Sequence, residues 1–320
     1  MAGFNTDLFI TGNARDLCPK KIFEMAKRDE DVVFVVSDMT TTLGVHAEFQ
    51  KLFPKRYIDV GIAEDGGVGI TAGLALAGKK PFFIAFGPFL SLRTVDQIHT
   101  DIAYNGMPVR LIGTHGGMTS GGGPTHYTIS EYGIMRAIPK MTMVAPADAN
   151  QCVKVLEAAL DYPDPMYIRI ARGSEPLVYE SQDYDYQIGT AITVKEGKDA
   201  TLIGTGIGVF NSLTAAIELE KCGIDVRVID MHTIKPLDMG AVLKAAAETG
   251  AIMTVEDHNI YAGLGGAVAE VLAESNIPCK FKRLGIPNEF PPLGYAEDLY
   301  KYYEFDGIGI AKQLKALLGK

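Results

Sequence analysis

The sequence has no long apolar segment and no run of basic residues. No apolar stretch approaches the about 20 residues that a membrane-spanning helix needs, and the N-terminal stretch MAGFNTDLFITGNARD lacks a basic region followed by an apolar one. Lys and Arg never occur more than two in a row, and the formal net charge is −9, whereas binding a phosphate backbone requires a basic face. These absences argue against membrane and nucleic-acid partners and predict a cytoplasmic protein.

Cysteine is also scarce. The four cysteines, Cys18, Cys152, Cys222 and Cys279, lie far apart and show no CxxC spacing. A structural zinc site or a disulfide framework needs closely spaced or paired cysteines. We therefore expect reduced thiols, mostly buried.

The composition is that of a compact globular protein. Of the 320 residues, 47% are hydrophobic and 22% are charged, which leaves enough apolar material for two domains that each have a core. Disorder is expected only near the chain ends.

In the first half, apolar strand-like segments alternate with helical ones. The segment VVFVVSD has five apolar residues in succession, which is typical of a strand buried on both faces. Similar strands are expected at 56–62, 80–87, 108–115, 141–148 and 166–173, and helices at 18–31, 70–78, 90–104, 130–136 and 149–161. This alternation predicts a parallel sheet with helices on both faces.

A polar, tyrosine-rich segment at 174–189 separates this half from a second, smaller α/β unit. Strands are expected there at 199–208, 225–236, 251–259 and 281–287, and helices at 211–223, 265–275 and 309–318. The glycines from Gly204 to Gly208 resemble part of a dinucleotide fingerprint, but a plain strand-to-helix turn explains them better. The sequence thus predicts an α/β fold of two doubly wound domains, residues 1–185 and 186–320.

Glu64 opens the part of the sequence richest in candidate site residues. It lies between a strand-like segment and a Gly/Ala-rich helix, so its alternative role is a charge that complements the helix dipole. Phe86 and Phe89 follow around a Gly-Pro turn, and His115 and His126 bracket a loop with five glycines. A carboxylate, aromatic walls, basic groups and a glycine loop are suited to a flat heteroaromatic cofactor and an anionic substrate.

The order of several short motifs carries a resemblance to a known family. GIAE, F-x-x-F-x-x-F, T-H, G-P-T-H, R-x-I-P and P-A-D occur in the order found in the pyrimidine-binding domain of transketolases. The later segments TGIGVFNSL, VIDMHTIKPLD and VEDHNIYAGLGGAVAEVLAE resemble the transketolase C-terminal domain, which has a mixed sheet. The resemblance therefore covers nearly the whole chain.

The resemblance implies thiamine diphosphate as cofactor. Glu64 stands where the family places the glutamate that binds N1′ of the aminopyrimidine, and Phe86 and Phe89 match residues of the aromatic pyrimidine pocket. Leu92 stands where many transketolases have a further aromatic residue, so it is expected to keep an apolar contact without stacking. His126 corresponds to the family histidine that faces the reacting carbonyl, which makes Glu64 and His126 the expected catalytic pair; an exposed loop histidine is the alternative.

The resemblance also implies a site for an anionic sugar. The expected substrate-binding residues are Arg15, Arg93, His115, His126 and Arg172, because guanidinium groups bind oxyanions well and histidine adds a donor. Alternatively, Arg15 caps a helix and Arg172 is paired at the domain boundary. The family loop usually reads G-E-D-G-x-T-H, whereas this chain has SGGGPTH. The acidic residue that tests a sugar hydroxyl is missing, so the donor and acceptor sugars stay open.

The chain contains no G-D-G motif, which the family uses to bind the diphosphate through a divalent metal. The resemblance therefore implies the C-terminal subunit of a split transketolase, with Mg²⁺ ligands and the diphosphate site on an N-terminal partner subunit, in a heterotetramer with two copies of each chain. Its expected activity is transfer of a two-carbon ketol unit from a phosphorylated or otherwise anionic ketose to an aldose. The alternatives are the β subunit of a 2-oxoacid dehydrogenase, a deoxyxylulose-phosphate synthase-like half, and a non-catalytic paralogue.

Overall fold

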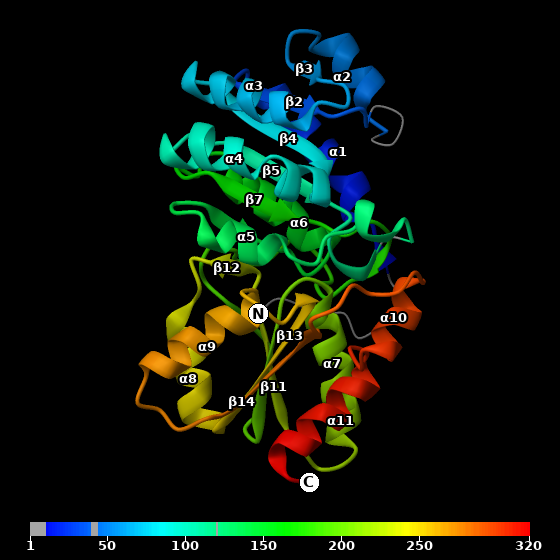
Figure 1. Ribbon diagram of the computed structural model, residues 1–320, viewed down its shortest axis with the longest axis vertical. Helices are drawn as coiled ribbons and strands as arrows, with labels where there is room; N and C mark the ends of the chain where they lie inside the picture. Colours follow the sequence, from blue (N-terminus) through cyan, green and yellow to red (C-terminus); the bar gives the residue numbers. More distant parts are fainter. Residues whose placement is uncertain (1–10, 40–43, 120) are drawn as a thin grey trace.

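The computed structural model describes residues 11–39, 44–119 and 121–320, and its helices and strands form two α/β domains (Figure 1). Within these residues, no helix combines the length and apolar character needed to cross a membrane. The structure confirms the expected pair of doubly wound domains. The exact boundary between residues 185 and 186 stays a prediction.

The first domain is built on a seven-stranded sheet with the strand order β12-β6-β7-β5-β4-β2-β3. Six of the strands are parallel to their neighbours, and β12 runs antiparallel to β6. All five residues of β2 are buried, as its unbroken apolar sequence predicts. The strands are β2 (Val32–Val36), β3 (Tyr57–Asp59), β4 (Lys80–Phe86), β5 (Arg110–Thr114), β6 (Thr142–Val144), β7 (Met166–Arg169) and β12 (Thr233–Lys235).

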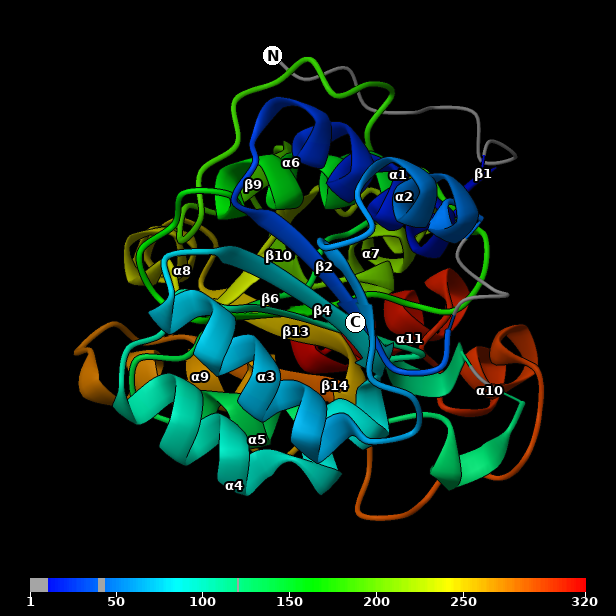
Figure 2. The same ribbon diagram turned by 90° about the horizontal axis from the view of Figure 1, so that it is seen from above.

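Helices cover both faces of this sheet, as Figure 2 shows from above. On one face lie α1 (Ala14–Arg28) and α6 (Ala149–Ala159), with α2 (His46–Leu52) beside β3. On the other face lie α3 (Glu64–Leu76), η1 (Phe89–Arg93), α4 (Val95–Gln97), η2 (Ile98–Tyr104) and α5 (Glu131–Ala137). The segment expected as one helix at 90–104 is therefore two π-helical stretches around a short α-helical turn.

The first helix begins earlier than the sequence predicted. Its expected start at Cys18 placed Pro19 in the first turn, but Asn13 caps α1 by accepting a 3.1 Å hydrogen bond from the backbone N–H of Arg15. Pro19 therefore lies inside the helix. A short antiparallel pair, β1 (Thr11–Gly12) with β8 (Glu175–Pro176), was also not predicted and joins this end of the chain to the segment after β7.

The second domain has a mixed five-stranded sheet with the order β14-β13-β10-β11-β9. Only β9 is antiparallel to its neighbour. The strands are β9 (Ile192–Lys195), β10 (Ala200–Gly204), β11 (Val226–Asp230), β13 (Ala251–Asn259) and β14 (Lys280–Ile286). The helices are α7 (Ile207–Glu220) and α11 (Gly307–Leu318) on one face, α8 (Met239–Thr249) and α9 (Leu264–Glu274) on the other, and α10 (Ala296–Tyr302) near the domain boundary.

The strand expected at 225–236 is in fact two strands in different sheets. β11 ends at Asp230 in the second sheet, and after a turn β12 pairs with β6 at the edge of the first sheet. The Lys235 ammonium then bonds the carbonyl of Arg136, 2.9 Å away, at the end of α5. The chain of the second domain thus completes the first sheet, and the two domains share a continuous boundary.

The glycines at the start of α7 serve close packing. A Cβ on Gly208 would lie 2.4 Å from the carbonyl oxygen of Val255 in β13, and a Cβ on Gly204 would lie 2.8 Å from Gly208. Only glycine lets the helix start this close to the sheet. This geometry agrees with a structural strand-to-helix turn.

Candidate functional site

Glu64 is the first residue of α3, at the edge of the sheet where the parallel strands end. Its side chain is 3% exposed. The hydroxyl of Ser37, directly after β2, donates a 2.9 Å hydrogen bond to Oε1, and the Arg93 guanidinium donates a 2.6 Å bond to Oε2. Glu64 therefore lies at a helix N-terminus, where its charge can complement the helix dipole. Its carboxylate is also held at the edge of the sheet where α/β folds bind ligands.

A cavity of about 300 Å³ opens beside this carboxylate. Its lining contains two carboxylates, two phenylalanines and an imidazole, which suits a planar, nitrogen-rich ring. The residues that line it are Ser37, Asp38, Met39, Ile62, Glu64, Phe86, Phe89 and His126. The structure thus brings together four of the residues predicted for the cofactor site and the reaction, namely Glu64, Phe86, Phe89 and His126.

The rings around the cavity contact one another. Phe86 and Phe89 stack with their centroids 5.6 Å apart and an interplanar angle of 26°. The His126 ring lies 5.7 Å from both of them, and His115 lies 4.1 Å from Phe86. Phe86 therefore links the two predicted histidines to the aromatic wall.

His115 is buried and uncharged. Burial, followed by the positive charges of Arg172 and Arg15, lowers the pKa of His115 from 6.5 to about 3. Its Nδ1 lies 2.8 Å from the Thr114 hydroxyl, and its backbone has a φ of 61°, which is uncommon outside glycine. The predicted residues Arg15, His115 and Arg172 therefore lie close enough to interact electrostatically, and His115 is a neutral donor or acceptor near pH 7.

Arg15 has an unused hydrogen-bond donor. Its Nε is buried and has no hydrogen-bond partner within the described ranges, and such an unpaired group is costly unless a ligand or water satisfies it. Arg172 is exposed. An unpaired guanidinium nitrogen and an exposed arginine, whose charges both act on His115, suit an anionic substrate.

Two predicted residues occupy different surroundings. Arg93 pairs with Glu64 and lies over the Phe89 ring at 4.6 Å, whereas it was expected to contact substrate. Leu92 is 48% exposed and is absent from the residues that line the cavity. The substrate role of Arg93 and the pyrimidine contact of Leu92 stay predictions.

Sequence reasoning missed Ser37, Asp38, Met39 and Ile62, which also line the cavity. Asp38 has a φ of 46°, and its N–H donates a 3.1 Å hydrogen bond to Oδ1 of Asp59. Strained residues of this kind cluster at functional sites. The position of Ser37 and Asp38 directly after a buried parallel strand was the signal that could have identified them.

The glycine loop before His126 packs against the second domain, with Ser120 outside the described residues. Gly123 has a φ of 73°, and a Cβ there would lie 2.8 Å from Leu293. The Tyr127 hydroxyl donates a 3.2 Å hydrogen bond to the carbonyl of Pro291. The segment after β14 therefore fixes the loop that carries His126.

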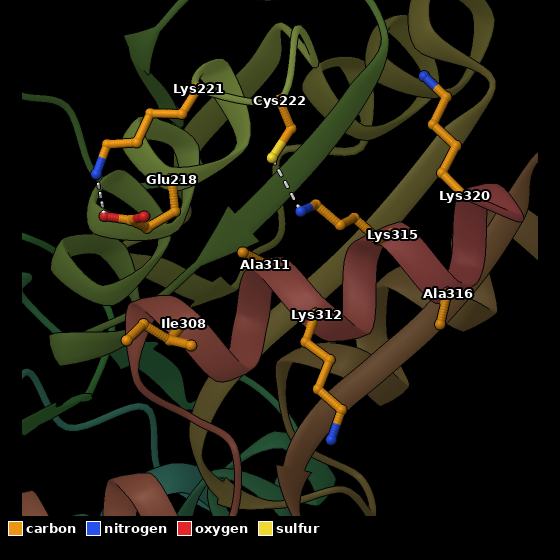
Figure 3. Close-up of a pocket in the computed structure, with 9 residues that line it drawn as sticks. All are labelled: Glu218, Lys221, Cys222, Ile308, Ala311, Lys312, Lys315, Ala316 and Lys320. Atoms are coloured by element: carbon orange, nitrogen blue, oxygen red, sulfur yellow. Dashed lines mark hydrogen bonds and ion pairs between the residues drawn. The ribbon is translucent and has the colours of Figure 1, made fainter.

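A larger cavity, of about 630 Å³, lies in the second domain between α7 and α11 (Figure 3). Four of the nine residues that line it are lysines, and the Lys315 ammonium lies 3.0 Å from the Cys222 sulfur. No buried carboxylate or histidine is among the described residues that line it. Size alone therefore does not identify the functional site, and the chemistry favours the smaller cavity.

Metal-binding side chains do not cluster in the part of the chain that the structure describes. No group of three or more His, Cys, Asp or Glu residues there is arranged to hold a metal ion.

Comparisons with known proteins agree with this geometry. The family described as transketolase, pyrimidine binding domain matches residues 13–176, and the transketolase C-terminal domain matches residues 189–310. The chain is 39% identical over 294 residues to an apulose-4-phosphate transketolase subunit of Phocaeicola vulgatus, covering 91% of this chain and 93% of the relative. It is 38% identical over 287 residues to the 6-deoxy-6-sulfo-D-fructose transketolase subunit SqwH of a Clostridium species, covering 89% and 88%.

A solved structure shows the same fold. A protein described as a split gene transketolase, inactive beta4 tetramer, superposes with a TM-score of 0.87 at 33% identity and covers 96% of this chain and 99% of its own. The buried glutamate, the aromatic cavity and these matches lead to one conclusion: the chain belongs to the transketolase family, with its pyrimidine-binding domain followed by its C-terminal domain.

Proposed function

We propose that this chain is the C-terminal subunit of a two-chain transketolase that uses thiamine diphosphate to move a two-carbon ketol unit between an anionic ketose and an aldose. The observation that carries the proposal is the buried carboxylate of Glu64 beside the stacked rings of Phe86 and Phe89 in one cavity. The relatives that match over nearly their whole length are named as transketolase subunits.

The residues present fit the aminopyrimidine end of the cofactor. Glu64 would bind ring nitrogen N1′, while Phe86 and Phe89 would contact the ring face. Bound thiamine diphosphate supplies a carbanion that can accept and release a two-carbon unit. Glu64 stabilises the proton on N1′ that this activation requires, and the apolar wall keeps water from the ring.

The second group of residues would bind the sugar. His126 faces the cavity and can donate a hydrogen bond to a carbonyl or hydroxyl oxygen of the substrate. His115 stays neutral across the physiological range, because its pKa is about 3. Arg15 and Arg172 would bind the anionic end, which agrees with relatives named for a phosphorylated and a sulfonated sugar.

The diphosphate end of the cofactor and its Mg²⁺ belong, in this proposal, to an N-terminal partner subunit with a G-D-G motif. Two observations support the partner: the sequence lacks that motif, and the similar split-gene structure, 99% of which this chain covers, is described as an inactive beta4 tetramer. The expected assembly has two copies of each chain, and the cytoplasmic location expected from the sequence stays part of the proposal.

A substrate panel tests this proposal. The chain and its partner, mixed with thiamine diphosphate and Mg²⁺, should transfer ketol units from phosphorylated or sulfonated ketoses to aldose acceptors. Decarboxylation of pyruvate in the presence of an aldose phosphate, without ketol transfer, would instead support a deoxyxylulose-phosphate synthase-like half. Oxidation of a 2-oxoacid with a lipoyl acceptor would support the dehydrogenase β subunit, and a complex inactive in all three assays would support the non-catalytic alternative.

A further inference from the structure

Arg93 makes two contacts in the candidate cofactor site. One guanidinium nitrogen donates a 2.6 Å hydrogen bond to Oε2 of Glu64, and the guanidinium carbon lies 4.6 Å from the centroid of the Phe89 ring. A guanidinium is planar, carries N–H donors at its edge and stacks on aromatic faces. Arg93 therefore presents an N–H edge to the carboxylate and lies over the ring at the same time.

These are the same two kinds of contact that the proposed function gives to the aminopyrimidine. An aminopyrimidine is also planar, stacks on phenylalanine, and presents an N–H at ring nitrogen N1′ once that nitrogen is protonated. With Ser37 bonded to Oε1 and Arg93 bonded to Oε2, both oxygens of Glu64 already have a partner. Groups of the chain itself thus satisfy both oxygens of the buried carboxylate.

The two residues of the pair differ in how easily they can move. Glu64 is 3% exposed and fixed at the start of α3, whereas the Arg93 side chain is 48% exposed. The half-exposed guanidinium regains water when it turns away, so the cost of breaking the pair falls mainly on the buried carboxylate, and a ring N–H that takes the place of Arg93 offsets that cost. The carboxylate would remain in place, held by the Ser37 hydroxyl.

The charge of Arg93 also opposes the chemistry required of Glu64. A guanidinium within hydrogen-bond distance of the carboxylate would repel a proton that Glu64 stabilises on a ring nitrogen. The Arg93 guanidinium and a protonated ring nitrogen would repel each other if both were bound to the same carboxylate oxygen. The charges therefore favour replacement of the guanidinium by the ring nitrogen.

We propose that Arg93 is an internal substitute for the aminopyrimidine, bound to Glu64 and over Phe89 in the free chain, and that the cofactor must displace it to bind. This inference rests on the proposed function, since it assigns the aminopyrimidine to Glu64. The inference predicts that the Arg93–Glu64 contact lowers the rate or the affinity of cofactor binding, because the arginine has to move away first.

Binding of a neutral fragment to the full chain tests the exchange. The probe is 4-amino-2-methylpyrimidine, which lacks the diphosphate and so reports only on this end of the site. Its dissociation constant is measured by NMR titration for the wild type, Arg93→Met and Arg93→Lys. Arg93→Met should bind the fragment about three- to fivefold more tightly, because no ion pair has to be broken before the fragment binds. Arg93→Lys should be intermediate, because lysine keeps the charge but loses the planar group.

Arg227→Met is a matched control. Arg227 also lies 2.6 Å from a glutamate, Glu248, but in the second domain. Because this pair lies outside the candidate site, the Arg227→Met variant should bind the fragment with the same affinity as the wild type. In the wild type, raising the salt concentration should tighten fragment binding, because salt screens the half-exposed Arg93 more than a ring held inside the cavity; this measurement needs no variant to fold.

The outcomes separate the inference from the proposed function. Equal or weaker fragment binding by Arg93→Met, together with a salt-independent wild type, would overturn the substitute role and leave the cofactor site intact. Glu64→Gln should greatly weaken binding. If that variant bound the fragment like the wild type, the assignment of the aminopyrimidine to Glu64 would fail, and the proposed function with it.

Discussion

The hydroxyl of Tyr179 donates a 2.6 Å hydrogen bond to Oδ2 of Asp230, joining the segment after β8 to the end of β11. The Gln151 amide donates to the same oxygen at 2.6 Å. Burial raises the pKa of Asp230 from 3.8 to about 7, against the lowering effect of these two donors. The boundary between the domains therefore contains a carboxyl group that is partly protonated near neutral pH.

We expect Asp230→Asn to reduce the pH dependence of stability. A carboxyl group whose pKa is higher in the folded chain than in the unfolded chain adds to the free energy of unfolding. This contribution is complete at a pH below the pKa of the unfolded chain, and it is lost as the pH rises through the pKa of the folded chain. The wild type should therefore lose stability relative to the variant between pH about 4 and pH about 7. Urea unfolding of both proteins across this range measures the difference.

Asparagine keeps the shape of the side chain and an oxygen that can accept from Tyr179, so the variant should fold. A constant difference in unfolding free energy between the two proteins at all pH values would show that Asp230 does not titrate in this range. If the wild type instead gained stability relative to the variant as the pH rose, the pKa of Asp230 would be lowered by folding rather than raised.

Gly208→Ala should destabilise the second domain by about 1–3 kcal/mol, the usual cost of overpacking. Its Cβ would lie 2.4 Å from the Val255 carbonyl oxygen, and a backbone atom of a central strand cannot easily move. The control is Gly73→Ala in α3, where nothing lies within 4 Å of the added Cβ. That change should be neutral or stabilise by about 0.5–1 kcal/mol. Similar thermal shifts for both variants would rule out the close packing at Gly208.

The sequence predicted the layers of the fold well, because buried parallel strands and their crossover helices leave strong apolar patterns. It did not predict that β11 and β12 belong to different sheets. The apolar run VIDMHTIKP looks continuous, and the break at Asp230 depends on partners 51 and 79 residues away in sequence, Tyr179 and Gln151. Short elements such as β1, β8 and β9 were missed because two to four residues carry little periodic signal.

For the site, the resemblance selected residues that the fold does bring together, including Glu64, Phe89 and His126. It did not select Asp38, which has no motif of its own and is identified only by its place after β2 and its φ of 46°. The pairing of Arg93 with Glu64 was also out of reach, because it depends on how the π-helical turn of η1 directs the side chain toward α3.

Glu64→Gln should lower ketol-transfer turnover by orders of magnitude in the assembled enzyme, while leaving the fold intact. The neutral amide lacks the negative charge that stabilises a proton on the ring nitrogen, so cofactor activation is lost. Steady-state kinetics with saturating cofactor measure the effect, and circular dichroism checks the fold. Turnover like that of the wild type would remove Glu64 from the mechanism.

Arg172→Ala should raise the KM for a phosphorylated or sulfonated ketose about tenfold, with little change in kcat, as expected when a charge-assisted contact to the substrate is lost. Arg15→Ala should act in the same direction. A neutral ketose without the anionic group is the control, and its KM should change little. A large fall in kcat at unchanged KM would place these arginines in the chemical step.

Assembly provides the last prediction. In the proposed function, Glu64 and the two phenylalanines contact only the aminopyrimidine end of thiamine diphosphate, and no metal-binding cluster occurs in the described part of this chain. The purified chain should therefore bind the cofactor weakly and transfer no ketol units, and a partner with a G-D-G motif should restore both. Light scattering of the mixture, with activity measured in parallel, should show a complex of two copies of each chain. If the chain alone bound Mg²⁺ and thiamine diphosphate at micromolar concentration and turned over a ketose, a diphosphate site would have to exist within its own 320 residues, and the two-chain proposal would be wrong.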